Sequence, residues 1–212
     1  MIRNGIIRGL LALVVFGFFV SCQPSGSNPS GGFAPETISA DDMKTAIRVI
    51  TEAFERNEGS NVVLTSFVIE GQSLGANREF ESTMLFKFDG GNSFYRKDVW
   101  QGDTMESWET YDKNNQAAPW TIVRGGETRT DAWSEMYDQL SYISLSDNEI
   151  EAAVPDENHY YNFTVGTKRV KLGFSDSKLR YIDMRENLHA GEYEYELYVK
   201  DYGETVVIPN HN

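Results

Sequence analysis

The sequence predicts an α+β protein made mainly of antiparallel β-strands, with one strongly curved sheet, an unclosed half-barrel, covered by two amphipathic helices. Three observations predict this class. Most of the chain after residue 61 alternates apolar and polar side chains with a period of two, as strands with one buried face do. Clusters of Gly, Asn and Asp separate these stretches and predict tight turns. Two stretches show helical spacing instead, and these helices can cover the apolar face of the sheet.

The first helix is expected at residues 39–54. Ser39 and Asp42 provide an N-terminal cap and an acidic first turn. The apolar stripe that follows consists of Met43, Ala46, Ile47, Ile50 and Phe54. A second helix is expected at residues 130–145, where the apolar residues at helical spacing are Trp133, Met136, Tyr137 and Leu140.

The strands are expected in two groups, one on each side of the second helix. The first group comprises residues 79–89, 93–101, 104–112 and 119–124. The second group comprises residues 159–165, 168–174, 178–185, 192–201 and 204–208. Glycine pairs at 90–91 and 125–126 are explained as hairpin turns.

The N-terminus has the three zones of an export signal. Arg3 and Arg8 precede an apolar run over residues 10–20, and Ser21 stands before Cys22. The run is shorter than the ~20 residues that a membrane-spanning helix needs. Residues 19–22, Phe-Val-Ser-Cys, resemble the lipobox of bacterial lipoproteins, although the first lipobox position is usually Leu. We therefore expect residues 1–21 to be a lipoprotein signal peptide and Cys22, the single cysteine, to carry lipid; an ordinary secretory signal and a short membrane anchor are the alternatives.

This signal predicts a lipid-anchored, extracytoplasmic protein of the bacterial cell envelope. Residues 22–38 are rich in Ser, Gly and Pro and are expected to form a flexible linker, followed by one domain at 39–209 and a tail at 210–212. Without residues 1–21 the chain has 17 Lys and Arg against 32 Asp and Glu, a formal net charge of −15. Such a charge disfavours nucleic acid and anionic headgroups as electrostatic partners.

The sequence offers no catalytic constellation. His159, His189 and His211 lack the spacing of a zinc site, and the acidic stretch 146–149 lacks the ligand pattern of a calcium loop. The chain has no nucleophilic serine in a Gly-x-Ser-x-Gly setting and no glycine loop of the phosphate-binding kind. We therefore expect a protein that is not an enzyme, with no metal and no cofactor.

Aromatic residues are abundant, with 4 Trp, 11 Tyr and 12 Phe, and many of them lie on the apolar faces of the expected strands. They predict a concave apolar face larger than two helices can fill, which would bind an acyl chain or a lipidated polypeptide. The alternative is that these residues fill an ordinary core. The expected cavity lining consists of Met43, Ile47, Ile50, Phe54, Phe67, Met84, Phe86, Phe88, Phe94, Trp100, Trp108, Trp120 and Ile122.

The end of the chain resembles a known family. Residues 198–209 read as a strand, a Tyr-Gly turn at Tyr202-Gly203 and a short strand that ends at Pro209. Together with the order of helices and strands over residues 39–209, this is similar to the LolA/LolB-like lipoprotein carriers, and most of all to tethered members of the LppX and LprG type. The resemblance implies an unclosed barrel with helices in its mouth, an apolar cavity for acyl chains and no catalytic residues. It also implies an arginine that holds the closed lid, for which Arg78 and Arg96 are candidates.

Two functions remain open at this stage. The first is a tethered carrier or receptor whose cargo is a lipid or an acylated protein, bound inside the half-barrel. The second is an interaction or stress-sensing envelope lipoprotein that binds another protein and whose cavity is filled by its own side chains.

Overall fold

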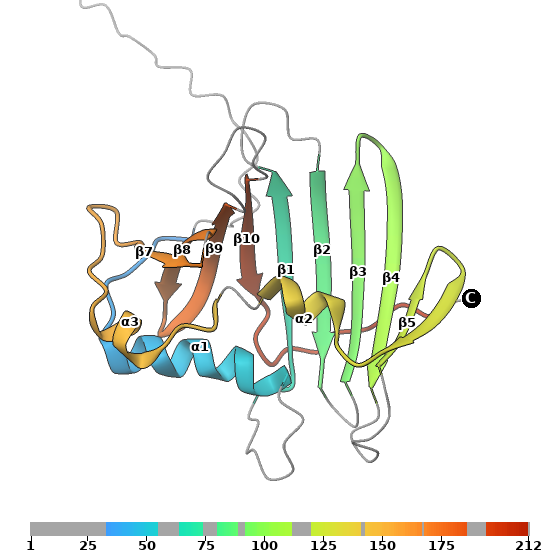
Figure 1. The fold of residues 1–212 in the computed structure, drawn as a ribbon, viewed down its shortest axis with the longest axis horizontal. Coiled ribbons are helices and arrows are strands. Elements are labelled where there is room, and N and C mark those ends of the chain that lie inside the picture. The colour runs from blue at the N-terminus through green and yellow to red at the C-terminus, as the bar shows by residue number, and fades with distance from the viewer. Residues whose placement is uncertain are drawn as a thin grey trace, which may run out of the picture.

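A computed structural model describes residues 33–54, 64–73, 80–88, 92–111, 120–140, 143–166, 168–185 and 194–211. They form one antiparallel sheet of ten strands in the order β6-β5-β4-β3-β2-β1-β10-β9-β8-β7 (Figure 1). The sheet is open, because β6 and β7 are its two edges and do not pair with each other. The expected mainly antiparallel architecture, with an open sheet and few helices, is confirmed.

The elements follow one another along the chain in three blocks. The first block is α1 (Ala40–Phe54), β1 (Ser66–Ser73), β2 (Phe80–Lys87), β3 (Asn92–Trp100), β4 (Asp103–Tyr111), β5 (Trp120–Arg124) and β6 (Glu127–Asp131). The second block is α2 (Glu135–Leu140) and α3 (Asp147–Glu151). The third block is β7 (Tyr161–Val165), β8 (Lys168–Ser175), β9 (Lys178–Arg185) and β10 (Glu194–Lys200).

Two meanders of consecutive strands meet in the middle of the sheet. The first runs from β1 to β6 and the second from β7 to β10, and β10 pairs with β1 to join them. At this junction β1 and β10 approach closely. A Cβ atom at Gly71 of β1 would lie 2.6 Å from Cδ2 of Leu197 on β10. A residue larger than glycine at this position would therefore push against the Leu197 side chain of the neighbouring strand.

The helices lie on one face of the sheet, which we call the inner face (Figure 1). The apolar stripe of α1 is buried against this face, and α1 contacts β9 and α3. Ser39 caps α1 as expected, since its hydroxyl oxygen accepts a hydrogen bond of 3.1 Å from the backbone N–H of Asp42. None of the helices in the described part of the chain is both long and apolar enough to cross a bilayer.

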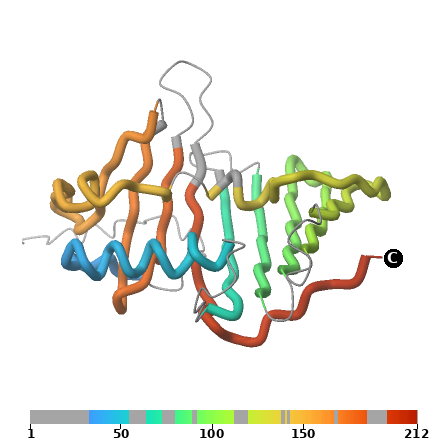
Figure 2. Tube along the Cα trace, turned by 60° about the horizontal axis from the view of Figure 1, so that its bottom comes forward, coloured from blue at the N-terminus to red at the C-terminus, as the bar shows by residue number. Residues whose placement is uncertain are grey.

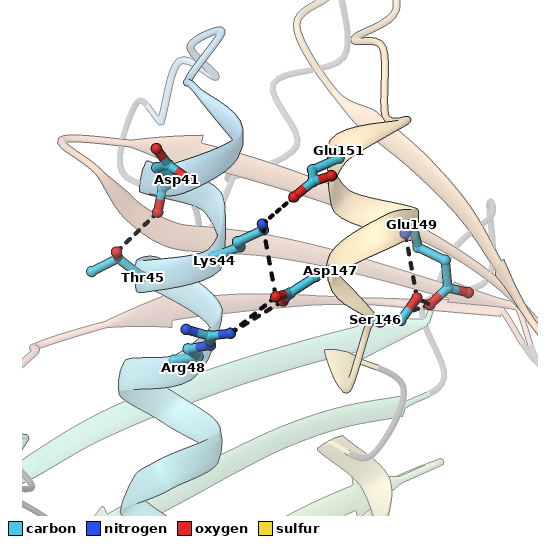
Figure 3. A network of polar contacts seen from close by, with 8 residues as sticks. All are labelled: Asp41, Lys44, Thr45, Arg48, Ser146, Asp147, Glu149 and Glu151. Atoms are coloured by element: carbon cyan, nitrogen blue, oxygen red, sulfur yellow. Dashed lines mark hydrogen bonds and ion pairs between the residues drawn. The ribbon is translucent and has the colours of Figure 1, made fainter.

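A polar network fastens α3 to the exposed side of α1 (Figure 3). Lys44 Nζ lies 2.6 Å from a carboxylate oxygen of Glu151, and Arg48 Nη2 lies 3.1 Å from one of Asp147. Ser146 caps α3 in a capping box with Glu149. These ion pairs are exposed, so the buried Ile150 contributes more than they do to holding α3 in place.

The helix expected at residues 130–145 is confirmed only over residues 135–140, which form α2. The first two residues of the expected range belong to β6, and the three residues after them lead into α2. The Gly125-Gly126 turn returns the chain as a hairpin, so β6 pairs with β5 along its whole length. The capping box at Ser146 then starts a separate helix, which the apolar spacing did not reveal.

The last expected strand, at residues 204–208, is also wrong. A turn at residues 201–203 does follow β10, with φ of 54° at Asp201 and 73° at Gly203, but the chain then continues without regular structure. Trp108 Nε1 donates a hydrogen bond of 2.8 Å to the carbonyl oxygen of Pro209, far along the sheet on β4. The segment 204–211 therefore crosses the face of the sheet opposite the helices (Figures 1 and 2). We call this face the outer face.

Candidate ligand-binding site

The centre of the inner face is an aromatic cluster around Phe54, the last residue of α1. The centroid of the Phe54 ring lies 4.6 Å from that of Tyr137 on α2. The rings of four further phenylalanines surround it at 6.1, 5.4, 5.3 and 5.2 Å, namely Phe67, Phe86, Phe88 and Phe94. One side chain of α1 thus contacts rings from β1, β2 and β3 and from the second helix at the same time.

Eleven of the thirteen residues expected to line a cavity are buried in one continuous core between α1 and the sheet. They are Met43, Ile47, Ile50, Phe54, Phe67, Met84, Phe86, Phe88, Phe94, Trp120 and Ile122. Period-two alternation places the strand residues of this set on the inner face, and helical spacing turns the α1 residues toward it. In this conformation the side chains of the set pack against one another.

The other two expected lining residues lie elsewhere. Trp108 is on the outer face, because its neighbours Ser107 and Glu109 are buried on the inner face. Its partner on the adjacent strand β3 is Tyr95. Its ring lies 5.3 Å from that of Tyr95 and 6.0 Å from that of His211. Trp100 is on the inner face but at the end of β3, where 47 % of it is exposed.

A polar network lies beside the aromatic cluster and is centred on Glu109, which has no exposed surface. Its carboxylate accepts a hydrogen bond of 2.6 Å from Ser134 Oγ and one of 3.1 Å from the backbone N–H of Met136. Ser134 in turn accepts from the N–H of Tyr137 at 3.0 Å. Glu109 therefore satisfies donors at the N-terminus of α2 and ties this short helix to β4.

Burial raises the pKa of Glu109 above its ordinary value. The hydrogen bonds from Ser134 and Met136, and the charges of Arg124 and Arg96, favour the ionised form but do not cancel the cost of burial. Arg124 Nη2 also donates to Glu135 of α2, and Arg129 pairs with the same carboxylate. The start of α2 is thus held by three strands, β4, β5 and β6.

The arginine implied by the family resemblance is not identified by the structure. Arg78 lies outside the described residues. Arg96 Nε donates to Asp98 Oδ1 at 2.7 Å, on its own strand, and Asp98 also accepts from Ser82 Oγ at 2.7 Å. Within the described chain, the arginines that pair with a helix on this part of the inner face are Arg124 and Arg129.

Sequence reasoning missed Glu109, Ser134 and Glu135. A usable signal exists for Glu109 alone, because it shares the strand face of the buried Tyr111. The ion pairs to Glu135 depend on where α2 begins, and the sequence prediction placed that start wrongly.

The other predicted features of the chain fall into two groups. Cys22 and His189 lie outside the described residues. His159 is within hydrogen-bonding distance of the Thr37 hydroxyl, 2.9 Å, and His211 contacts Trp108. Among the described residues no three His, Cys, Asp or Glu side chains come together in a way that would hold a metal ion.

The comparisons with known proteins add no assignment to this geometry. No protein-family model matches the chain, and a comparison with curated proteins gave no match.

Proposed function

We propose that the protein is a lipid-tethered component of the bacterial cell envelope that binds an acyl chain, of a lipid or of an acylated protein, between α1 and the sheet. The observation that carries the proposal is the aromatic cluster around Phe54, which joins α1, α2 and three strands through ring contacts alone. An acyl chain needs apolar surroundings and no directed hydrogen bonds, and the packed rings of this cluster would supply such surroundings once they separate.

The extent of the apolar inner face supports this proposal. Buried apolar side chains continue from Tyr161 on β7 to Ile122 on β5, across nine of the ten strands. One helix of 15 residues and two helices of six and five residues cover this face. We further propose that the sheet curves strongly into an unclosed half-barrel, with α1 and α2 as its two-helix cover, as the resemblance to the LolA/LolB-like carriers implies.

Access to the cluster would require Phe54 and Tyr137 to separate. Isolated helices as short as α2 are unstable in water, so α2 depends on its contacts with Glu109, Arg124 and Arg129. Movement of α2 together with the end of α1 would open the cluster while the strands stay in place. We propose that cargo enters by this route.

The close packing of the rings favours a second candidate function. Phe54 occupies the middle of the cluster, so the protein's own side chains fill the space that an acyl chain would take. If this packing is permanent, the protein is an envelope lipoprotein that binds another protein and carries no lipid.

Uptake of a fluorescent fatty acid by the full chain separates the two functions. If the protein is a carrier, the wild type should take up the fluorescent fatty acid saturably. Phe54→Ala serves as the positive control, because a large apolar void binds hydrophobic molecules regardless of natural function. Val49→Ala, an exposed apolar position on the same helix, is the matched substitution and should leave uptake unchanged. Uptake by Phe54→Ala alone would reject the carrier function and support the second candidate.

A further inference from the structure

The segment before α1 is docked on the outer face through Phe33. The Phe33 ring stacks on Tyr181 with centroids 6.3 Å apart and meets Tyr160 edge-on at 6.5 Å. Gly173 makes room for these rings, because a Cβ atom there would lie 2.8 Å from Tyr160 and 3.0 Å from Phe33. The chain then passes the end of β8, where the N–H of Glu36 donates to the carbonyl oxygen of Phe174 at 2.8 Å, and enters α1 on the inner face.

This docking fixes the place where the proposed tether meets the body. Phe33 lies eleven residues after Cys22, and a fully extended chain of that length spans at most about 36–40 Å. A lipid on Cys22 therefore keeps the Phe33 site, on the outer face over β8 and β9, within that distance of the bilayer surface.

The same part of the sheet carries an excess of positive charge. Residues 168–185, which form β8, β9 and their turn, contain six Lys and Arg and two Asp, a formal charge of +4. The chain from Cys22 onward carries −15 in total, so the remainder carries −19. An anionic or phosphate-rich surface attracts the first region and repels the second, which orients the molecule.

A pocket of about 210 Å³ lies next to the Phe33 site. Side chains of Asn162, Thr164, Arg169 and Lys171 line it together with the buried Asp183. Lys171 Nζ lies 5.6 Å from the centroid of the Tyr160 ring, so the pocket and the Phe33 site share a wall. Guanidinium, ammonium, amide and hydroxyl groups are the donors that bind phosphate oxygens. The carboxylate of Asp183, which also lines the pocket, repels an anion, so binding there depends on the two cations Arg169 and Lys171.

We propose that this part of the outer face, around the pocket on β7, β8 and β9, is the surface that contacts phospholipid headgroups of the membrane that holds the tether. Arg169 and Lys171 bind headgroup phosphates there. This inference rests on the proposed tether at Cys22, and it is independent of whether acyl chains enter the inner face.

Two matched cysteine variants of the full lipidated chain test this surface. Lipidation consumes the thiol of Cys22, so a cysteine introduced elsewhere is the only free thiol available for a fluorophore. Thr164→Cys on β7 and Thr110→Cys on β4 replace exposed threonines on two strands of the outer face that are separated by six others. Both proteins are reconstituted in vesicles of phosphatidylethanolamine and phosphatidylglycerol that contain headgroup-labelled quencher lipids.

Quenching should be several-fold stronger at position 164 than at position 110. Arg169→Glu combined with Lys171→Glu should remove this difference, whereas Lys87→Glu with Lys97→Glu, the same change in charge on β2 and β3, should preserve it. Added glycerol phosphate should not abolish the difference in quenching. It would saturate a site for a free phosphate, whereas it would not displace a surface that is held at the bilayer. Equal quenching at both positions in vesicle-bound protein overturns the proposed surface; failure of the wild type to stay on vesicles overturns the tether as well.

Discussion

At the scale of single residues, Phe54 is the side chain on which the apolar site depends. Its ring contacts side chains of α2 and of three strands, and it is almost fully buried. Phe54→Ala should lower the free energy of unfolding by about 3–5 kcal/mol, because it removes a buried ring and leaves a void. Val49→Ala, at a position that is 36 % exposed, should change it by less than about 0.5 kcal/mol. Urea unfolding of both variants checks this, and equal losses would show that Phe54 is not central to the core.

Glu109 makes a contribution to the stability of the protein that depends on pH. Burial raises its pKa in the folded state, so the folded protein binds this proton more tightly than the unfolded chain does. The contribution of Glu109 to stability is therefore complete below the unfolded pKa of about 4.3 and is lost as the pH rises through the higher folded pKa.

Glu109→Gln removes this titration. The free energy of unfolding of the wild type, relative to that of the variant, should decrease as the pH rises from 4 to 7. Urea midpoints at several pH values measure the difference, with Glu127→Gln on the exposed edge strand β6 as the control. A difference that is constant or rises with pH would contradict the assignment.

At the scale of elements, the C-terminal segment 204–211 acts as a strap across the outer face. It is held at its start by the N–H of Gly203, which donates to the carbonyl oxygen of Ser66 at 2.8 Å, and near its end by Trp108. Within the strap, the side chain of Val206 is buried, whereas that of Val207 is exposed. The strap thus covers a face that the helices leave uncovered.

Trp108→Phe tests both the strap and the outward position of Trp108. The substitution keeps a ring against Tyr95 but removes the hydrogen bond to Pro209, which should cost about 1 kcal/mol. Thermal unfolding measures this loss. Uptake of the fluorescent fatty acid should stay at the wild-type level, and a marked loss of uptake would mean that Trp108 reaches the cavity after all.

The elements that the sequence predicted correctly have strong periodicity. Strands with alternating apolar and polar residues, such as β2 and β10, and the amphipathic α1 were all predicted near their positions in the structure. Edge strand β6 has no apolar face, so its residues resembled the start of a helix. The segment 204–208 is rich in β-branched residues, as strands are, but the positive φ angles at the preceding turn direct it out of the sheet.

The apolar part of the candidate site was predictable for the same reason, and the polar part was not. Phe67, Phe86 and Phe94 follow the alternation, so they meet on one face. Trp108 was placed wrongly because hydrophobicity suggested an inward tryptophan, whereas the buried Glu109 takes the inward position on β4. A carboxylate can be buried there because Ser134 and the start of α2 hydrogen-bond to it, and sequence spacing cannot show that contact.

At the scale of the whole molecule, we propose a tether at Cys22, a headgroup-binding outer surface on β7, β8 and β9, and an acyl-binding inner face. The tether is tested by detergent phase separation of the protein made in a bacterial host. Wild type should enter the detergent phase, because acyl chains contribute roughly 0.8 kcal/mol per buried methylene. Cys22→Ser should remain in the aqueous phase, and Ser21→Ala, which keeps a small residue before the cysteine, should behave as the wild type. Partition of the wild-type protein into the aqueous phase would contradict lipidation at Cys22.

Native mass spectrometry of the full chain, purified from a bacterial envelope, tests the central claim most directly. The Cys22→Ser protein is measured in parallel, so that covalent lipid and bound cargo are counted separately. We expect both proteins to carry an additional lipid mass that disappears on denaturation, and only the wild type to keep a covalent acyl mass. The contradicting result is that neither the wild type nor the Cys22→Ser protein releases a lipid, while the Phe54→Ala variant purified in the same way does. That result would rule out acyl-chain binding at the Phe54 cluster.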